Sequence, residues 1–196
     1  MCSTGCNDAL DGQLVQWIRE TPSLMAALRA VRELGLPSWA IGAGAVRNVV
    51  WDRLHGHGHA TLLHDVDVVY FDSDNASSEA EQSVQRHLNK ALPAIHWDVT
   101  NQAPVHLWYE QAFGQAVAPL TSLEQGIATW PEYATCVGVC MSADEQLQVI
   151  APYGLDDLFE MRVRWNPARV SAAYYRERIR QKALCKRWPL VRVELP

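Results

Sequence analysis

The sequence predicts an α/β domain of the α+β type, in which helices flank a short mixed central sheet. Three observations support this class. Short runs of β-branched and aromatic residues alternate along the chain with segments of helical periodicity. The length of 196 residues suits one domain that can bury a core without disulfides. Hydrophobic residues make up 48% of the chain and charged residues 20%, which excludes a largely disordered protein.

The first part of the chain is predicted to contain three helices and one strand. Thr21 and Pro22 form a typical helix start, and Gly35 is a typical helix end. A short apolar run then predicts a buried strand, and small residues after it predict a tight turn. The predicted elements are a helix around 14–18, a helix over 22–34, a strand over 39–41, a turn over 42–44 and a helix over 46–54.

The middle of the chain is predicted to alternate two strands with one helix. Residues 65–71 are rich in β-branched and aromatic side chains, which favour a strand. Ser78 and Glu81 have the spacing of a capping box at a helix start, and Pro93 ends that helix. Apolar and polar side chains alternate over residues 95–100. This alternation predicts a strand with Trp97 on its buried face and Asp98 on its polar face.

The remainder of the chain is predicted to form helices and one hairpin. We divide the sequence into a domain over residues 1–161, which includes the N-terminal helices, and a basic helical extension over residues 162–196. The predicted elements are a helix over 105–112 closed by Gly114, a short helix capped by Thr121 and Glu124, hairpin strands over 136–141 and 147–150, a short helix over 155–159 and a basic helix that starts near Asn166 and Pro167.

Charge is distributed unevenly along the chain. The net charge is −5, yet residues 1–161 carry 20 acidic and 7 basic side chains, whereas residues 162–196 carry 2 acidic and 10 basic ones. An acidic body argues against a protein that is coated in nucleic acid. We expect the basic extension to pack on the body as an amphipathic helix. Arg176, Arg180 and Lys182 are our candidates for cations at the rim of a phosphate-binding cleft.

The sequence also indicates the cellular location and the state of the cysteines. No apolar run approaches the roughly 20 residues of a membrane span, and the N-terminus does not resemble a signal peptide. We therefore expect a cytoplasmic protein with no membrane partner. The five cysteines are expected to be reduced thiols, with a metal or disulfide through Cys2 and Cys6 as the alternative. The histidines within 55–64 could bind a metal or a phosphate, but we expect a solvated loop.

Three aspartates are candidates for metal binding and catalysis. Asp65 and Asp67 are two residues apart on a predicted strand, so their side chains share one face. Hard cations such as Mg²⁺ or Mn²⁺ bind carboxylate oxygens together with phosphate oxygens. Asp98 lies on the polar face of another predicted strand, and a third carboxylate could complete a site for two metal ions. The alternative for Asp65 and Asp67 is a pair of solvated acids on an exposed strand or a charged edge strand. The alternative for Asp98 is a strand-end acid that bonds to Thr100 or Asn101.

A turn of small residues is the candidate phosphate site. Gly42, Ala43 and Gly44 stand between a predicted strand and a helix start, where backbone N–H groups and the helix dipole favour an anion. Arg47 lies one turn into that helix and could contact phosphate or form a surface ion pair. The turn is neither a Walker A motif nor a dinucleotide-binding fingerprint. A plain strand-to-helix turn is the alternative interpretation.

These motifs together resemble the polymerase-β-like nucleotidyltransferase superfamily. The likeness is greatest to a small, mostly bacterial nucleotidyltransferase-like family, long catalogued as a domain of unknown function, and it extends over residues 36–190. The stretch 44–48 is also similar to the Gly-x-Val-Arg-Asp motif of CCA-adding enzymes, although Asn48 replaces the aspartate. The segments that carry the resemblance are GAGAVRNVVWDRLHG, DVDVVYFD, WDVTNQAPVHLWY, TWPEYATCVGV, APYGLDDLFEMRVRWNP and KRWP.

The resemblance implies the nucleotidyltransferase fold and a metal-dependent transfer of a nucleoside monophosphate from an NTP to a hydroxyl group. It matches Gly42 and Gly44 to the glycine motif, Asp65 and Asp67 to the metal-binding pair and Asp98 to the third carboxylate. The implied cofactor is Mg²⁺ or Mn²⁺. The acceptor could be RNA, a protein or a small molecule. The alternatives are a catalytically inactive nucleotide-binding or interaction module of the same fold and a metal-dependent phosphohydrolase.

Overall fold

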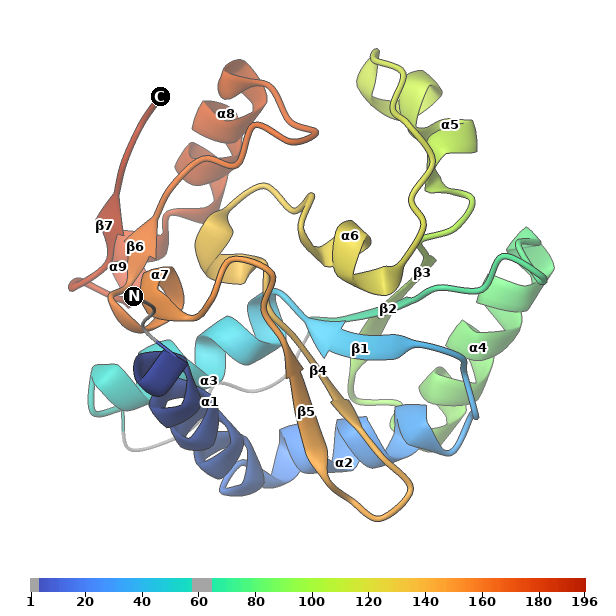
Figure 1. Ribbon diagram of the computed structural model, residues 1–196, viewed down its shortest axis with the longest axis horizontal. Coiled ribbons are helices and arrows are strands. Elements are labelled where there is room, and N and C mark those ends of the chain that lie inside the picture. Colours follow the sequence, from blue (N-terminus) through green and yellow to red (C-terminus); the bar gives the residue numbers. More distant parts are fainter. Residues whose placement is uncertain (1–3, 58–64) are drawn as a thin grey trace.

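A five-stranded mixed sheet with the order β3-β2-β1-β4-β5 forms the centre of the molecule (Figure 1). The computed structural model describes residues 4–57 and 65–196. The predicted class, a mixed α/β fold around a short central sheet, is confirmed. The strands are β1 (Trp39–Gly42), β2 (Asp65–Tyr70), β3 (His96–Asn101), β4 (Gly138–Met141) and β5 (Leu147–Ile150).

Strand pairing brings segments that are distant in the sequence into one row. β2 pairs in parallel with β3, β1 pairs antiparallel with β2 and β4, and β4 forms the predicted hairpin with β5. The register places Asp67 beside Asp98 on one side and beside Gly42 on the other. β4 begins at Gly138 and not at Cys136, because the 3-10 turn η1 (Tyr133–Thr135) ends just before it.

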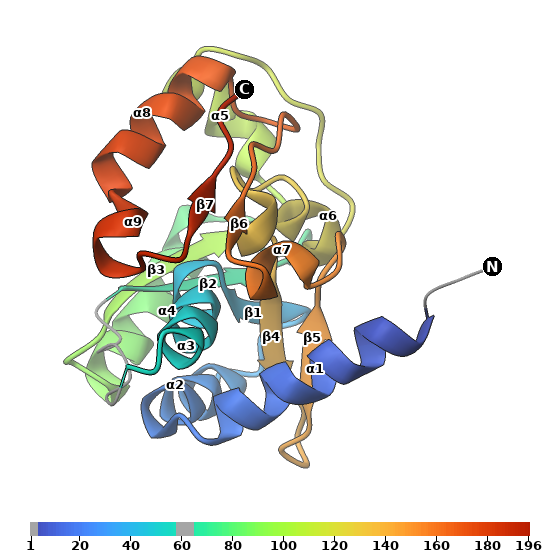
Figure 2. The ribbon, with the colours of Figure 1, turned by 90° about the vertical axis from the view of Figure 1, so that its left-hand side faces the viewer.

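Four helices cover one face of the sheet, as Figures 1 and 2 show. They are α1 (Thr4–Arg19), α2 (Pro22–Arg32), α3 (Gly44–Leu54) and α4 (Ser78–Ala91). Val66, Val68 and Trp97 point into the core on this side and are completely buried. Because successive side chains of a strand point to opposite faces, the intervening residues Asp67 and Asp98 point to the other face. Burial of the apolar side chains therefore fixes the direction of the carboxylates.

Helices also border the second face of the sheet. In Figure 1, α5 and α8 stand on opposite sides above the sheet. The elements on this side are α5 (Val105–Phe113), α6 (Leu123–Ile127), α7 (Asp156–Phe159), α8 (Ala172–Lys182) and α9 (Leu184–Arg187), together with a small parallel sheet of β6 (Arg162–Val163) and β7 (Arg192–Val193).

The basic extension lies against the rest of the chain through buried aromatic residues. Tyr175 is completely buried, and its hydroxyl lies 3.0 Å from the carbonyl oxygens of Val163 and Glu194. Trp188 is nearly buried, and its indole N–H donates to Asp52 on α3 at 2.9 Å. The Tyr175 bonds hold the extension together internally, and the Trp188 bond joins it to α3 of the domain.

Three predicted helix starts differ from the structure. α4 is capped by Ser77 and not by Ser78, because the Glu81 carboxylate accepts from the Asn101 N–H instead of closing a capping box. Ser122 and not Thr121 caps α6. The basic helix starts at Ala172 and not near Asn166, because the buried Asn166 amide donates to two backbone carbonyls, those of Ala128 and Trp130.

Other predictions concern the membrane and the cysteines. Among residues 4–57 and 65–196, no helix has the length and apolar character needed to cross a bilayer. Cys136, Cys140 and Cys185 are free thiols. Cys2, the side chain of Cys6, His59 and His64 lie outside the described part of the structure. His55 has a structural role: its Nε2 accepts from the Leu190 N–H at 3.0 Å, which ties α3 to the C-terminal segment.

Candidate active site

Two aspartates lie directly opposite each other on the open face of the sheet. Asp67 on β2 and Asp98 on β3 are partners in the parallel register. Burial raises the pKa of Asp67, and the nearby Asp98 carboxylate raises it further. Lys182, Arg178 and Arg47 oppose this shift through their positive charges. A bound cation or cationic side chains would therefore stabilise the charged form of the Asp67 carboxylate.

Asp65 lies on the same face of β2 but farther from this pair. Its carboxylate is 84% exposed and lies 3.3 Å from Nδ1 of His96, its neighbour in register. The structure thus places all three predicted aspartates on one face. It brings Asp67 and Asp98 together and leaves Asp65 at the outer end of the row.

Two adjoining cavities open around Asp67. We call the first, of about 200 Å³, the carboxylate pocket, and the second, of about 320 Å³, the cationic pocket. The carboxylate pocket is lined by Ala43, Asp67, Val69, Asp98, Thr100, Gln102, Trp130, Pro131, Thr135 and Arg178. The cationic pocket is lined by Ala43, Gly44, Arg47, Asn48, Asp65, Asp67, Thr135, Arg178, Lys182 and Arg187.

The turn between β1 and α3 forms one wall of the cleft. Ala43 has a φ of +48°, an uncommon conformation for a residue with a side chain, and it lines both pockets. Gly44 lines the cationic pocket at the first position of α3, whose N-terminus has no side-chain cap. Backbone N–H groups at such a helix start bind anions. Gly42 is placed differently: a Cβ there would lie 2.3 Å from the Trp130 ring, so this glycine packs beneath Trp130.

Arg47 is a buried cation of the cationic pocket. It is 7% exposed, and its guanidinium lies 5.3 Å from the ring centres of both Trp51 and Trp188. Its Nη2 donates to Oδ1 of Asn48 at 2.9 Å. Burial lowers the pKa of Arg47 to about 10, with Glu132 opposing the shift. The side chain therefore remains charged at neutral pH, and the aromatic rings hold it at the pocket wall.

The basic extension supplies the other cations of this pocket, Arg178 and Lys182 from one face of α8 and Arg187 from α9. Arg178 and Lys182 both line the cationic pocket. Arg178 Nε donates to Oε1 of the buried Glu132. Burial lowers the pKa of Lys182, and Arg178 and Arg47 lower it further. These positive charges face a space with no acidic side chain besides Asp65 and Asp67 among the described lining residues.

The structure separates our three predicted tail cations. Lys182 lines the cationic pocket, whereas Arg176 donates to the carbonyl of Pro196 and Arg180 pairs with Glu177 at the surface. Sequence reasoning did not select Arg178. Residues four apart share a helix face, so Arg178 and Lys182 belong together, while Arg176 and Arg180 form another pair. This periodicity was the signal that could have identified Arg178.

The donor atoms of the cleft suit a hard divalent cation. Asp67 and Asp98 present carboxylate oxygens, which Mg²⁺ and Mn²⁺ prefer, and Mg²⁺ typically combines one or two carboxylates with phosphate oxygens of a substrate. Within the described residues, no group of three or more His, Cys, Asp or Glu side chains is arranged to hold a metal ion. A metal here would therefore draw further ligands from the substrate or from water.

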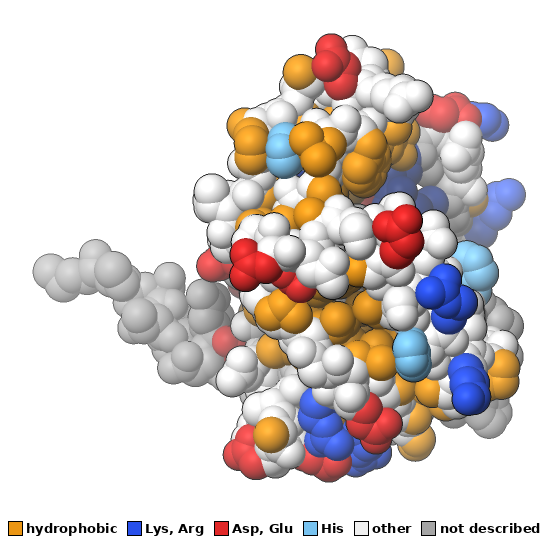
Figure 3. All heavy atoms as spheres, turned by 90° about the vertical axis from the view of Figure 1, so that its right-hand side faces the viewer, with side chains coloured by type: hydrophobic (Ala, Val, Ile, Leu, Met, Phe, Trp, Pro, Cys, Tyr) orange, Lys and Arg blue, Asp and Glu red, His pale blue; other side chains and the backbone are white. Residues whose placement is uncertain are grey.

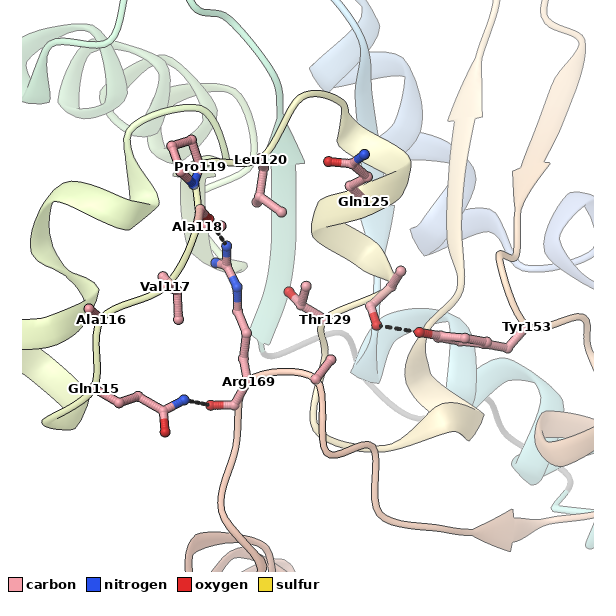
Figure 4. A pocket seen from close by; sticks show the side chains of 12 residues that line it. Gln115, Ala116, Val117, Ala118, Pro119, Leu120, Gln125, Thr129, Tyr153 and Arg169 are labelled. Atoms are coloured by element: carbon pink, nitrogen blue, oxygen red, sulfur yellow. Dashed lines mark hydrogen bonds between the residues drawn. The ribbon is translucent and has the colours of Figure 1, made fainter.

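A larger cavity lies elsewhere in the described part of the structure. It has a volume of about 580 Å³, and Figure 4 shows its lining residues around Arg169. Its polar groups bind one another: Arg169 donates to the Ala118 carbonyl, Gln115 donates to the Arg169 carbonyl, and Tyr153 donates to the Ala128 carbonyl. No described acidic side chain lines it. We therefore do not place the chemistry in this cavity.

A mixed sheet with paired aspartates on neighbouring strands, beside a strand-to-helix turn, defines a nucleotidyltransferase-type domain. A family model described as nucleotidyltransferase matches residues 29–193, and the chain belongs to this family. The predicted resemblance and fold are thereby confirmed.

The solved structures that match the chain include the following two. One is an NMR structure described as a CCA-adding enzyme head domain, with a TM-score of 0.80 and 27% identity, covering 94% of this chain and 96% of the other. Another is a tRNA-processing enzyme in an apo form, with a TM-score of 0.47 and 15% identity, covering 85% of this chain and 44% of the other. A comparison with curated protein sequences gives no match.

Proposed function

We propose that this protein transfers a nucleoside monophosphate from an NTP to a hydroxyl-bearing acceptor with the help of Mg²⁺ or Mn²⁺. The observation that carries the proposal is the position of Asp67 and Asp98, side by side on the sheet and next to a pocket lined by cations. Membership of the nucleotidyltransferase family supports it. The likeness to a CCA-adding enzyme head domain supports the same reaction class.

The cationic pocket would hold the β- and γ-phosphates. The backbone at Ala43 and Gly44 offers N–H groups at the start of α3, and Arg47, Arg178 and Lys182 offer positive charge. Gly42 remains a predicted part of this turn, and its packing beneath Trp130 would hold the turn in place. Catalysis of this kind depends mainly on positioning and charge neutralisation.

The aspartates would hold the divalent ions and receive a proton. Asp65 and Asp67 would bind metal together with the phosphates, and Asp98 would bind the metal nearest the acceptor. Such ions, when bound, neutralise charge on the phosphates and lower the pKa of the attacking hydroxyl. Asp98 would accept the hydroxyl proton. The acceptor oxygen forms a bond to the α-phosphorus as the bond from that phosphorus to the β-phosphate bridging oxygen breaks, and pyrophosphate leaves.

One observation favours the inactive module as a second candidate. Asp65 lies beside His96 at the outer end of the row, so two carboxylates and not three adjoin each other. A protein of this kind would bind an NTP with its metal and release no product. The two candidates differ in pyrophosphate release, which only the transferase shows.

The experiment is a transfer assay with α-labelled NTPs, Mg²⁺ or Mn²⁺ and a panel of RNA, protein and small-molecule acceptors. The transferase predicts label in an acceptor together with an equal amount of pyrophosphate. Asp67→Asn should abolish both, whereas Asp74→Asn, on an exposed loop outside the cleft, should leave both unchanged. Release of nucleoside monophosphate without an acceptor would indicate a phosphohydrolase. Binding without any product would indicate the inactive module.

A further inference from the structure

A further cavity continues from the carboxylate pocket on the side of Asp98. We call it the aromatic groove; it has a volume of about 190 Å³. It shares Thr100, Gln102, Trp130 and Pro131 with the carboxylate pocket and no residue with the cationic pocket. The cationic pocket and the aromatic groove therefore adjoin different sides of the carboxylate pocket. The other lining residues of the groove are Val105, Trp108, Tyr109, Phe113, Thr129, Arg169, Val170 and Tyr174.

Aromatic side chains from α5 and α8 remain partly open to solvent at this groove. Trp108 is 42% exposed, Phe113 46% and Tyr174 43%. The centre of the Phe113 ring lies 6.0 Å from the centre of the Tyr174 ring and 4.5 Å from the centre of the Tyr109 ring. Figure 3 shows hydrophobic side chains gathered on the upper part of the face that carries α5. A cluster of exposed aromatic rings of this kind is typical of a ligand surface.

Gln102 adds a polar side chain to the wall of the groove. Its side chain is 7% exposed and lines both the carboxylate pocket and the aromatic groove. Its amide makes no hydrogen bond within the part of the chain that the structure describes. Gly126 packs against it so closely that a Cβ there would lie 2.8 Å from Oε1. Among the described residues, the Tyr70 hydroxyl is the buried side-chain polar atom that lacks a hydrogen-bond partner, so the Gln102 amide atoms are open to the cleft. A ligand with a donor and an acceptor would bond this amide in place of water.

The geometry of transfer assigns this end of the cleft to the acceptor. In phosphoryl transfer, the attacking and leaving oxygens lie roughly in line through the phosphorus. If pyrophosphate leaves toward Arg47 and Lys182 in the cationic pocket, the attacking hydroxyl approaches from the other side of the carboxylate pocket. The aromatic groove adjoins that side, beyond Asp98 and Thr100.

The charge of the groove argues against a polyanionic acceptor. Among its described lining residues, Arg169 is the single cation. Its Nη2 donates to the Ala118 carbonyl at 2.9 Å, and its guanidinium lies 5.3 Å from the centre of the Tyr109 ring. Affinity for RNA depends on cations that neutralise phosphates. The groove offers aromatic rings and the Gln102 amide in place of such cations.

We propose that the aromatic groove binds the acceptor of the transfer reaction, and that this acceptor is an uncharged molecule with a planar ring close to its hydroxyl. The ring would stack on Trp108 and Tyr174, and its polar edge would bond the Gln102 amide. A nucleoside and a small phenolic alcohol share this chemistry. The inference rests on the proposed nucleotidyl transfer.

The test compares acceptors in wild-type protein and in two matched variants of α5. Labelled ATP with Mg²⁺ is offered to adenosine, tyrosol, glucose and a short RNA with a free 3′ hydroxyl. Trp108→Ala removes a groove ring, whereas Leu107→Ala removes a neighbouring side chain that is 75% exposed and does not line the groove. We expect transfer to adenosine or to tyrosol, and the one that is labelled shows whether the acceptor is a nucleoside or a phenolic alcohol. In Trp108→Ala the KM for this acceptor should rise about tenfold, the KM for ATP should stay constant, and Trp108→Phe should restore most of the loss.

Several results would overturn the inference. Transfer to RNA or glucose alone would show another acceptor class, while nucleotidyl transfer itself would stand. A rise in the KM for ATP in Trp108→Ala would place the base of the NTP in the groove. If no acceptor is labelled, the NMR signal of the Trp108 indole tests whether the groove binds a planar ring. This signal is assigned by its loss in Trp108→Phe. A shift of that signal by adenosine or tyrosol would uphold ring binding although the transfer proposal had failed, and no shift would refute the groove as well.

Discussion

Asp67 and Asp98 are direct neighbours in the parallel register of β2 and β3, so two carboxylates face the same cleft across one strand spacing. Burial and the Asp98 charge both raise the pKa of Asp67. Such a pair is unfavourable by itself and favourable when a cation lies between its members. Their arrangement is therefore the basis of each functional proposal made above.

Asp67→Asn should stabilise the protein in buffer without divalent ions. The pKa of Asp67 is raised in the folded state, so the charged carboxylate destabilises the fold above the pKa of the unfolded chain. At neutral pH the free energy of unfolding should increase by up to about 1 kcal/mol, as for like charges that face each other across a sheet. Below the unfolded pKa, where the group is protonated in both states, the difference should vanish. Thermal melts at several pH values measure this, and a lower melting temperature at pH 7 would contradict it.

Gly44→Val should reduce NTP affinity more than it reduces stability. A Cβ at Gly44 would have ordinary contact with Arg47 at 3.6 Å, so the fold tolerates it, but the added side chain would block phosphate from the helix start. Gly12→Val, in α1 with open space around it, is the matched control for the cost of valine in a helix. Isothermal titration with ATP and Mg²⁺ compares the two. Equal ATP affinities of the Gly44→Val and Gly12→Val proteins would show that this turn does not contact the nucleotide.

Gly42→Ala should instead affect the fold. The new methyl group would lie 2.3 Å from the Trp130 ring and 3.0 Å from the Val137 carbonyl oxygen. Overpacking of this kind typically costs about 1–3 kcal/mol. Urea unfolding measures the loss, and unchanged stability would show that Trp130 moves aside freely.

Lys182→Gln should weaken ATP binding about tenfold, as expected for a hydrogen bond to a charged group. The paired replacement of Arg176 and Arg180 by Gln is the control, because these side chains contact Pro196 and Glu177 outside the cleft. Arg178 is unsuitable for this purpose, since its removal would leave the buried Glu132 without its partner. Equal losses in both variants would indicate nonspecific attraction by the basic extension.

Removal of residues 167–196 should unfold the protein. Tyr175 and Trp188 belong to the core, and loss of such a buried aromatic side chain typically costs about 3–5 kcal/mol. Together these losses approach the usual stability of a whole domain, about 5–15 kcal/mol. Removal of residues 195–196 alone is the control. A truncated protein that melts like the full chain would mean that the extension is an independent arm.

The sequence predicted the sheet and the face of its aspartates more completely than the cations around them. Alternation of apolar and polar residues in β2 and β3 is a local property, so the shared face of Asp67 and Asp98 followed directly. The start of α8 depends on a distant contact, because Asn166 binds the carbonyls of Ala128 and Trp130. Which face of α8 meets the cleft is likewise set by distant contacts, such as that of Arg178 with the buried Glu132.

Tertiary packing also determined features that no local pattern contains. The caps of α4 and α6 involve neighbouring Ser or Thr residues that are equally good by sequence, and Asn101 drew Glu81 away from the expected capping box. The closeness of Trp130 to Gly42 joins segments far apart in the chain. The aromatic groove likewise forms between α5 and α8, and pairings of this kind appear only in three dimensions.

The most direct test of the central claim is the stoichiometry of the reaction in Asp98→Asn and Asp74→Asn proteins. With α-labelled ATP, Mg²⁺ and the acceptor panel, the wild-type protein and Asp74→Asn should form one labelled acceptor for each pyrophosphate released. Asp98→Asn should lose both products, by a factor of roughly 100 or more if it removes the group that accepts the proton. Equal product formation by Asp98→Asn and wild type, or no pyrophosphate from the wild type with any acceptor, would contradict nucleotidyl transfer at this cleft.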